Sequence, residues 1–289
     1  MRARAGRGAR ELVASVSMAD LANVHRRLNR ETRDAWDGYR DQRARVMALI
    51  GEPTRDDERL LVLGAGNCND VDLDALAERF VEVHLVDIDA SALKAAVSRA
   101  GERAREVTRT HRLDVSGLLE RIGKWKRRPP SPETLRDVPE RAAASLGKLP
   151  IPFDRVVSSL VLSQLVHSAM VGLGVGHPAL EAVSKISVIA HLTMATRALR
   201  PGGRLVLVVD TVARPPEVMA EWIAAHGPDA LLHRLEASGQ CLPGTEVALV
   251  TQVLHDLSPS ASIELEPAWT WSPGARTHLV YALRVHSAG

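Results

Sequence analysis

The residues that could do chemistry gather first in the stretch LLVLGAGNCND, which runs from Leu60 to Asp70. An apolar run followed by closely spaced glycines is typical of a buried strand that turns tightly into a helix. Glycines in such a turn let the backbone approach the phosphate or sugar of a nucleotide-like ligand. Gly64 and Gly66 therefore predict a nucleotide-like ligand at the end of this strand.

Two carboxylates follow the glycine turn at the spacing used to bind a ribose. Asp87 lies 21 residues after Gly66, and Asp89 ends the same segment, VEVHLVDID. A carboxylate about 20 residues beyond such a turn can accept hydrogen bonds from ribose hydroxyls. Asp87 is the closer match, so we predict that it binds the ribose. Its alternative role is to cap the next helix, for which Ser91 is a second candidate.

The turn departs from the dinucleotide-binding fingerprint. It has the sequence GAGNCN, so Asn69 stands where G-x-G-x-x-G has its third glycine. That glycine allows close helix–strand packing beside a pyrophosphate. Its absence disfavours a nicotinamide-dependent oxidoreductase, which we keep as the weakest alternative.

The elements that must position these residues alternate between strand and helix. This alternation predicts an α/β fold, in which a doubly wound, mostly parallel sheet has helices on both faces. A Ser-Pro-Gly turn near the end of the chain predicts a C-terminal antiparallel hairpin. The predicted strands are residues 60–66, 81–89, 107–115, 153–162 and 204–212, with the hairpin at 262–285, and helices are predicted at 18–50, 72–80, 91–104, about 184–198 and much of 215–257.

Composition divides the chain into three parts. Residues 1–17 are expected to be a disordered basic leader, since the first ten residues hold four Arg and no acid. Residues 18–54 are expected to form an N-terminal helical cap, and 55–289 the ligand-binding domain. Within that domain, the proline-rich segment 116–152 is longer than a usual connection, which predicts a lid or a surface insertion with short helices.

Several classes of protein are excluded or disfavoured. The net charge is +2, and without the first ten residues it becomes −2, so no global attraction to nucleic acid is expected. Cys68 and Cys241 are too few for a zinc site or a disulfide framework, which fits a cytoplasmic protein without a metal. The longest apolar run is interrupted by polar residues, so no membrane span is expected.

The chain resembles the class I S-adenosylmethionine (SAM)-dependent methyltransferases over about residues 55–212. The segments that carry the resemblance occur in the order typical of that family: LLVLGAGNCND, VHLVDID, RLDV, FDRVVSSLVLSQL and LRPGGRLVLVVD. The resemblance implies a seven-stranded sheet with its last strand inserted antiparallel, and SAM as the cofactor. Two positions depart from the family pattern, because Val62 stands where an acid is common and Cys68 where a third glycine is common.

The resemblance also implies a set of cofactor-binding residues. SAM is expected to lie over the glycine turn, with its ribose on Asp87, its adenine near Asp114 and its methionine end near Ser158. Asn67, Asn69 and Asp70 are further polar candidates for the methionine end, and Trp36 and Tyr39 either close over the cofactor or pack in the core. The expected cofactor-binding residues are Gly64, Ala65, Gly66, Asn67, Asp87, Ile88, Asp114, Val115, Ser158 and Ser159.

The chemistry requires little beyond alignment of the reactants. The sulfonium of SAM is already an activated leaving group, so a general base is needed only when the acceptor carries a proton. Gln164 and His167 follow the fourth strand and are three residues apart, which places them on one face of a helix. We predict that Gln164 orients the acceptor and that His167 accepts a proton. In the alternative, His167 packs against the helix.

These observations predict SAM-dependent methyl transfer to a small-molecule, peptide or protein acceptor. The first alternative is a methyltransferase fold that has lost catalysis and serves as a binding or partner protein. A nucleic-acid base is disfavoured as acceptor, since SSLVL follows the fourth strand in place of Asn/Asp-Pro-Pro-aromatic. The segment KWKRR around Trp125 is expected to be a solvated helix end rather than a phosphate-binding site.

Overall fold

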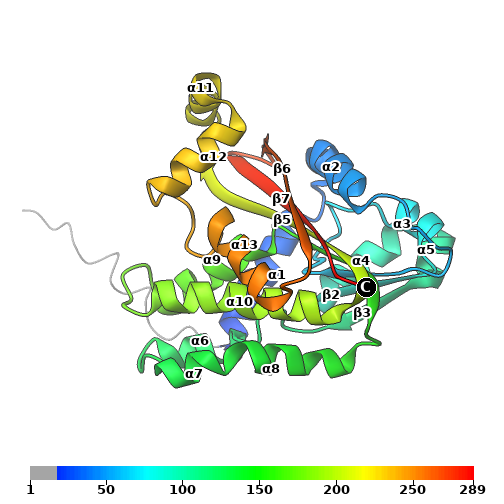
Figure 1. Cartoon of the computed structure of the whole chain (residues 1–289), viewed down its shortest axis with the longest axis horizontal. Coiled ribbons are helices and arrows are strands. Elements are labelled where there is room, and N and C mark those ends of the chain that lie inside the picture. The colour runs from blue at the N-terminus through cyan, green and yellow to red at the C-terminus, as the bar shows by residue number, and fades with distance from the viewer. Residues whose placement is uncertain (1–17) are drawn as a thin grey trace, which may run out of the picture.

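A computed structural model describes residues 18–289, and the predicted leader at 1–17 lies outside them. The described residues form a seven-stranded sheet with the order β3-β2-β1-β4-β5-β7-β6 (Figure 1). The first five strands are parallel, whereas β7 runs antiparallel to both of its neighbours. The predicted mostly parallel sheet with a C-terminal hairpin is confirmed. The strands are β1 (Arg59–Leu63), β2 (Glu82–Asp87), β3 (Thr108–Arg112), β4 (Phe153–Ser159), β5 (Leu199–Arg214), β6 (Ser262–Trp271) and β7 (Thr277–His286).

Alternation along the central strands divides the core into two halves. In β1, Leu61 and Leu63 face one half, while Leu60 and Val62 face the other. Because both faces are apolar, the sheet needs helices on both sides. The first half is covered by α6 (Leu119–Trp125), α8 (Val138–Ala144), α9 (Val161–Leu173), α10 (Leu180–Ala198) and α13 (Val247–Leu257); the second half is covered by α2 (Arg40–Ile50), α3 (Leu73–Arg79), α4 (Ala90–Arg99) and α5 (Glu102–Val107).

The N-terminal cap is not the single helix that was predicted. It consists of α1 (Met18–Glu31), the 3₁₀ helix η2 (Trp36–Tyr39) and α2. The guanidinium of Arg43 stacks 3.4 Å from the centre of the Trp36 ring, and Tyr39 packs edge-on against Trp271 of β6 at 4.7 Å. These contacts hold η2 and α2 to the sheet, while the break after Glu31 lets α1 take its own direction.

The insertion at 116–152 is part of the core, which corrects the expectation of a lid or a surface insertion. It holds α6, α7 (Pro132–Arg136), α8 and the 3₁₀ helix η3 (Ser145–Lys148), and α8 packs along α10 (Figure 1). Trp125, Val138 and Leu146 are each at most 7% exposed. Trp125 is therefore a core residue, while Lys124, Arg127 and Arg128 around it are exposed at the end of α6, as expected for a solvated helix end.

The remaining two helices, α11 (Pro216–His226) and α12 (Pro228–Ala237), follow β5 and project from one end of the molecule (Figure 1). They enclose a cavity of about 220 Å³ beside Trp222 and Arg234. None of the predicted site residues lines this cavity. No helix within residues 18–289 has the length and apolar character needed to cross a bilayer.

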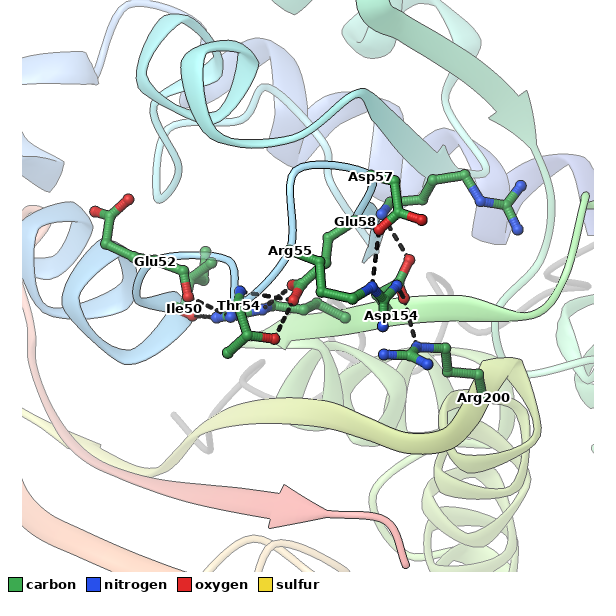
Figure 2. Close-up of polar contacts among 10 residues, drawn as sticks. Ile50, Glu52, Thr54, Arg55, Asp57, Glu58, Asp154 and Arg200 are labelled. Carbon is green, nitrogen blue, oxygen red and sulfur yellow. Dashed lines mark hydrogen bonds and ion pairs between the residues drawn. The ribbon is translucent and has the colours of Figure 1, made fainter. Parts of the chain in front are cut away.

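A buried ion pair lies at the amino ends of the central strands β1 and β4, at the end of the sheet opposite the glycine turn (Figure 2). Arg155 of β4 donates from Nε to Glu58 at 2.9 Å, and these side chains are only 2% and 3% exposed. Arg155 also donates to the backbone carbonyls of Ile50 and Glu52, at the end of α2. Because buried charges need several partners, this network holds α2 to the starts of β1 and β4. Beside it, Asp154 pairs with Arg55 and Arg200.

Candidate functional site

A small cavity lies at the carboxyl ends of β1 and β2, beneath α1. Its volume is about 30 Å³. In open parallel sheets, this edge is where ligands bind. The structure brings six of the predicted site residues together around it, namely Gly64, Asp87, Ile88, Asp114, Val115 and Gln164.

The glycine turn has the shape that a close approach requires. Gly64 and Gly66 have φ angles of 68° and 49°, which L side chains rarely adopt. A Cβ on Gly64 would lie 2.4 Å from a methyl carbon of Val161, so glycine is also needed for α9 to approach the turn. Cys68 has a φ of 52°, so the chain keeps a left-handed conformation where the family often has a third glycine. The departure at Cys68 thus changes the side chain and not the turn.

The structure distinguishes the two candidate carboxylates. Asp87 accepts hydrogen bonds from the backbone N–H groups of Gly66 at 2.9 Å and Asp89 at 2.8 Å, and it borders the cavity. Asp89 caps α4 by accepting from Ser91 and Ala92, so Asp89, and not Ser91, is the cap. Burial raises the pKa of Asp87 to about 6. Asp87 thus borders the cavity while Asp89 does not, and its binding of a ribose stays a prediction.

The loop after β3 forms the side of the cavity at which the adenine was expected. Leu113 and Val115 supply apolar surface, whereas Asp114 is already engaged. Its carboxylate accepts from the backbone N–H groups of Ser116 at 2.8 Å and Leu119 at 3.0 Å. Its carboxylate also accepts from the Ser116 hydroxyl at 2.7 Å, so Asp114 shapes the loop that begins α6.

Ser158 does not face the cavity, which corrects the expectation that it meets the methionine end. Its side chain is fully buried and its Oγ lies 2.7 Å from Nε2 of His191 in α10. Nδ1 of His191 lies 3.2 Å from the carbonyl oxygen of Val115. A carbonyl only accepts, so Nδ1 carries the proton and Ser158 donates to Nε2. The Ser158–His191 pair thus holds the loop at Val115 through the carbonyl of that residue.

Helix α1 covers the site through contacts that the sequence did not indicate. The Nδ2 groups of Asn67 and Asn69 donate to the backbone carbonyls of Asn29 and Thr32, each at 2.6 Å. Nε2 of His25 lies 2.7 Å from Ser168 in α9. The Nδ2 groups of Asn67 and Asn69 thus bind α1 and the residue that follows it, while their Oδ1 atoms make no hydrogen bond within the described residues. These pairs join segments more than 30 residues apart, so no local pattern predicts them.

His25 and Asn29 occupy the space beside Gly64 and Asp87. Pockets that bind ligands of cofactor size have volumes of roughly 300 Å³ or more. The donors, acceptors and apolar groups fit an adenosine, but the space of about 30 Å³ does not. A ligand of that size therefore requires α1 to move away from the glycine turn.

The two predicted catalytic residues lie on one exposed face of α9. Gln164 borders the cavity. His167 does not border it, but lies close enough to His25 for its charge to affect that ring, whose pKa is lowered mainly by burial. Gln164 is thus at the mouth of the cavity and His167 lies one helical turn further along.

Ser159 faces the half of the molecule opposite to Ser158, because the two are consecutive in a strand. It is 5% exposed, and its hydroxyl lies beside Asp70 without an aligned hydrogen bond. Burial raises the pKa of Asp70, and the Ser159 hydroxyl acts in the opposite direction. Ser159 and Asp70 therefore form a polar position on the far side of the glycine turn.

A second group of polar side chains was not singled out from the sequence. Asp210 of β5 accepts from the hydroxyl of Ser163 at 2.5 Å, and its other oxygen lies 3.0 Å from Nδ1 of His278 in β7. The ring of Trp271 lies 5.3 Å from that of His278. Asp210 follows the apolar run of β5, and a polar residue at a strand end was the available signal. No signal in the sequence indicated His278, since only the inserted position of β7 brings it beside Asp210.

Comparisons with known proteins extend to solved structures alone. No family model matches the sequence, and no curated protein matches it. The chain is similar to the YcgJ protein of Bacillus subtilis, at 12% identity over 86% of this chain and 99% of that one, with a TM-score of 0.47. Two further similar structures are the glycopeptide N-methyltransferase MtfA in complex with SAM (12% identity, 85% and 93% coverage, TM-score 0.44) and precorrin-6y C5,15-methyltransferase of Geobacter metallireducens GS-15 (12%, 85% and 87%, 0.41).

Proposed function

Because the chain has the fold of the class I SAM-dependent methyltransferases, we propose that it transfers the methyl group of SAM to a small-molecule, peptide or protein acceptor. The fold is defined by the sheet itself, whose inserted antiparallel β7 gives the order β3-β2-β1-β4-β5-β7-β6. The observation that carries the proposal is the hydrogen bond between Gly66 and Asp87 at the edge of the cavity. This hydrogen bond connects the glycine turn, which would approach the cofactor, with Asp87, whose carboxylate would hold the ribose of the cofactor.

The residues around the cavity would each hold one part of the cofactor. Asp87 would accept hydrogen bonds from the ribose, and Ile88, Leu113 and Val115 would contact the adenine. Asp70 would pair with the ammonium group of the methionine end, since its carboxylate makes no ion pair within residues 18–289.

SAM supplies an activated methyl group on a sulfonium when it is bound. The protein's part is to hold the acceptor in line and to exclude water, and proximity alone can contribute several kcal/mol, up to about 7–11 in the best cases. Gln164, which borders the cavity, would contact the acceptor. Helix α1, by returning over the turn, would exclude water from the site.

Calorimetric titration with SAM and with NAD tests the proposal. We expect SAM to bind and Asp87→Ala to weaken binding at least tenfold, because hydrogen bonds to charged groups contribute about 1.5–3 kcal/mol each. Glu217→Ala, an exposed carboxylate on α11, is the matched control and should bind normally. Unchanged affinity in Asp87→Ala would overturn the site, and binding of NAD alone would point to the oxidoreductase.

A binding protein without catalytic activity is the second candidate. It is favoured by α1, whose His25 and Asn29 fill the space beside the glycine turn. Such a protein should form no S-adenosylhomocysteine from SAM in the presence of an acceptor, even after α1 is loosened by Asn29→Ala. Formation of S-adenosylhomocysteine with an acceptor would argue for the methyltransferase.

A further inference from the structure

The second polar group has the arrangement of an oriented base. His278 faces Asp210 through Nδ1, and Asp210 is itself fixed by Ser163. A carboxylate accepts, so Nδ1 carries the proton and Nε2 of the neutral ring keeps its lone pair. Nε2 makes no hydrogen bond within residues 18–289, and the His278 side chain is 22% exposed. A carboxylate that orients an imidazole with a free nitrogen is the arrangement used to remove protons from nucleophiles.

This arrangement lies next to the proposed cofactor cavity. The first turn of α9 connects the two, since Val161 and Gln164 border the cavity and Ser163, between them, donates to Asp210. Asp210 lies in the carboxyl-end half of β5, two residues beyond Val208, the last residue of β5 that pairs with β4. The Asp210–His278 pair therefore lies against the first turn of α9, which also borders the cavity that would hold the cofactor.

Two aromatic side chains complete the group. Trp271 lies 5.3 Å from His278 and 4.7 Å from Tyr39, measured between ring centres. Nε1 of Trp271 is buried and forms no hydrogen bond within the described residues. An unpartnered buried N–H is costly, so its presence marks a position where an acceptor atom of a ligand, other than its ammonium group, can bind. We call Tyr39, Asp210, Trp271 and His278 the carboxyl-end cluster.

We propose that the carboxyl-end cluster binds the amino group of the methyl acceptor and that His278 removes its proton. The inference rests on the proposed function, and it narrows the acceptor to a primary or secondary amine. Aromatic rings and a carboxylate together are the groups that recognise a protonated amine.

The step balances without a further reactant. Nε2 of His278 takes one proton from the bound ammonium, which leaves a neutral amine with a lone pair. That lone pair forms the new N–C bond while the S–C bond of the sulfonium breaks, and its electron pair stays on sulfur as a neutral thioether. The positive charge moves from sulfur to nitrogen, where Asp210 can stabilise it.

Charge around the cluster favours an amine over a hydroxyl. A hydroxyl acceptor gains negative charge as its proton leaves, whereas an amine ends the reaction as a cation. The phenol of Tyr39 experiences the same surroundings: burial, then the charges of Asp70 and Asp210, raise its pKa. The basic neighbour Arg43 is directed elsewhere, since it donates to the carbonyls of Trp36 and Asn69. Burial, the largest of these causes, disfavours any charge, so it is the carboxylates of Asp70 and Asp210 that favour a cationic acceptor over an anionic one.

Two isosteric probes test the class of ligand. The full chain, with uniform ¹⁵N labelling, is titrated with 2-phenylethylamine and with 2-phenylethanol while the indole N–H resonance of Trp271 is followed by NMR. We expect saturable shifts, with a Kd at least tenfold lower for the amine. Asp210→Asn should remove this preference, and Arg234→Ala in the remote α11–α12 cavity should keep it. Equal affinities, tighter binding of the alcohol, or no shift with either probe would overturn the amine site.

The role of His278 has its own readout. Long-range ¹H–¹⁵N spectra of the wild-type protein should show the neutral ring protonated at Nδ1, and Asp210→Asn should shift the proton to Nε2. A wild-type ring protonated at Nε2 would have no lone pair there and would exclude it as the base. Thermal melting of Asp210→Asn shows whether the variant is folded, and the wild-type spectra decide the question without it.

Failure of this inference is separable from failure of the proposed function. If SAM does not bind in calorimetry but the amine preference persists, the methyltransferase proposal fails and the amine site stands. If SAM binds but the two probes bind equally, the fold is a methyltransferase whose acceptor is not selected by this cluster.

Discussion

Asp87 combines burial with a ligand-facing position. Two backbone N–H groups hold its oxygens, yet burial raises its pKa to about 6, so its charge changes close to neutral pH. Hydrogen bonds to an ionised acceptor are roughly twice as strong as those to a neutral one. The cofactor would therefore bind more tightly to the ionised form.

The first prediction follows from that charge. As the pH falls through about 6, Asp87 takes up a proton, and SAM affinity should fall by about 5- to 10-fold, equivalent to roughly 1 kcal/mol of hydrogen-bond strength. Calorimetry at pH 7.5 and pH 5 measures the change. Asp87→Asn should bind weakly at both values, and a wild-type affinity that does not vary between them would contradict the assignment.

The second prediction concerns His191, whose ring is fully buried between Ser158 and Val115. Burial lowers its pKa from 6.5 to about 4. The pKa of His191 is lower in the folded than in the unfolded protein, so burying the neutral ring adds to the free energy of unfolding only above pH 6.5. As the pH falls to about 4, up to about 3 kcal/mol of that free energy is lost. Urea unfolding between pH 7 and 4 should show a smaller decline for His191→Gln than for wild type. Parallel declines would show that His191 is not responsible.

What could be predicted at this scale was local. The glycine turn and Asp87 lie within one strand–helix–strand unit, so the number of residues between them was sufficient to predict that they lie close together. Ser158 was placed wrongly because adjacent strand residues face opposite sides, and the sequence does not say which of Ser158 and Ser159 faces α10. The Asp210–His278 pair could not be found, since its residues are 68 apart and meet only through the register of β5 and β7.

At the scale of elements, α1 decides access to the glycine turn. Asn29 donates to Asp89 at 3.2 Å and borders the cavity together with His25. A ligand that needs this space binds only to molecules in which α1 has moved away. Its apparent affinity is therefore the intrinsic affinity multiplied by the fraction of such open molecules.

The third prediction concerns a substitution that weakens the contact of α1 with the site. Asn29→Ala removes one hydrogen bond of about 1 kcal/mol, so the association rate of SAM in stopped-flow experiments should rise about 5-fold. Asn23→Ala is the control, because Asn23 lies on the same helix but bonds only the exposed Arg26 among the described residues. A slower association of SAM with Asn29→Ala would indicate that α1 assists binding instead of opposing it.

The fourth prediction concerns the ion pair at the opposite edge. Glu58→Gln leaves the buried guanidinium of Arg155 without its charged partner, which typically costs about 3–5 kcal/mol of unfolding free energy. Chemical denaturation measures this loss. The neighbouring Asp57→Asn, whose carboxylate is exposed, should leave the melting temperature nearly unchanged. Similar losses in both variants would show that burial of the pair is not the cause.

Helix boundaries were the least predictable elements, for a physical reason. The amphipathic pattern over 18–50 continues through the break at η2, because Arg43 and Trp36 stay on one face while stacking across it. The insertion at 116–152 seemed a surface feature from its prolines. Its apolar residues, such as Leu118 and Ile122, instead complete the core beside α10.

At the scale of the whole molecule, the fold was the most predictable feature. Alternating strands and helices require a doubly wound sheet, and a terminal hairpin can join it only at an edge or by insertion. The order of strands beyond β5 was expected from the family resemblance and not from the pattern. Its consequence for function is that β7 brings His278 beside Asp210.

The fifth prediction concerns the two ends of the chain. Removal of residues 1–17 should leave the melting temperature nearly unchanged, as expected for a basic leader. Removal of residues 272–289 deletes β7, which pairs with both β5 and β6, and should abolish cooperative unfolding followed by circular dichroism. A cooperative transition in the C-terminal truncation would contradict the central role of β7.

The position of β7 also has a consequence for synthesis. β7, the last of these seven strands to be synthesised, is not an edge strand, because it lies between β5 and β6. Until it emerges, the nascent chain presents the open edge of β5, with apolar residues such as Leu207 and Val209, and β6 has no neighbour. Unpaired apolar edges are prone to associate with other chains. Every copy of this protein therefore passes through a stage at which β5 and β6 have been synthesised while the sheet is still divided, and only the synthesis of β7 can join them.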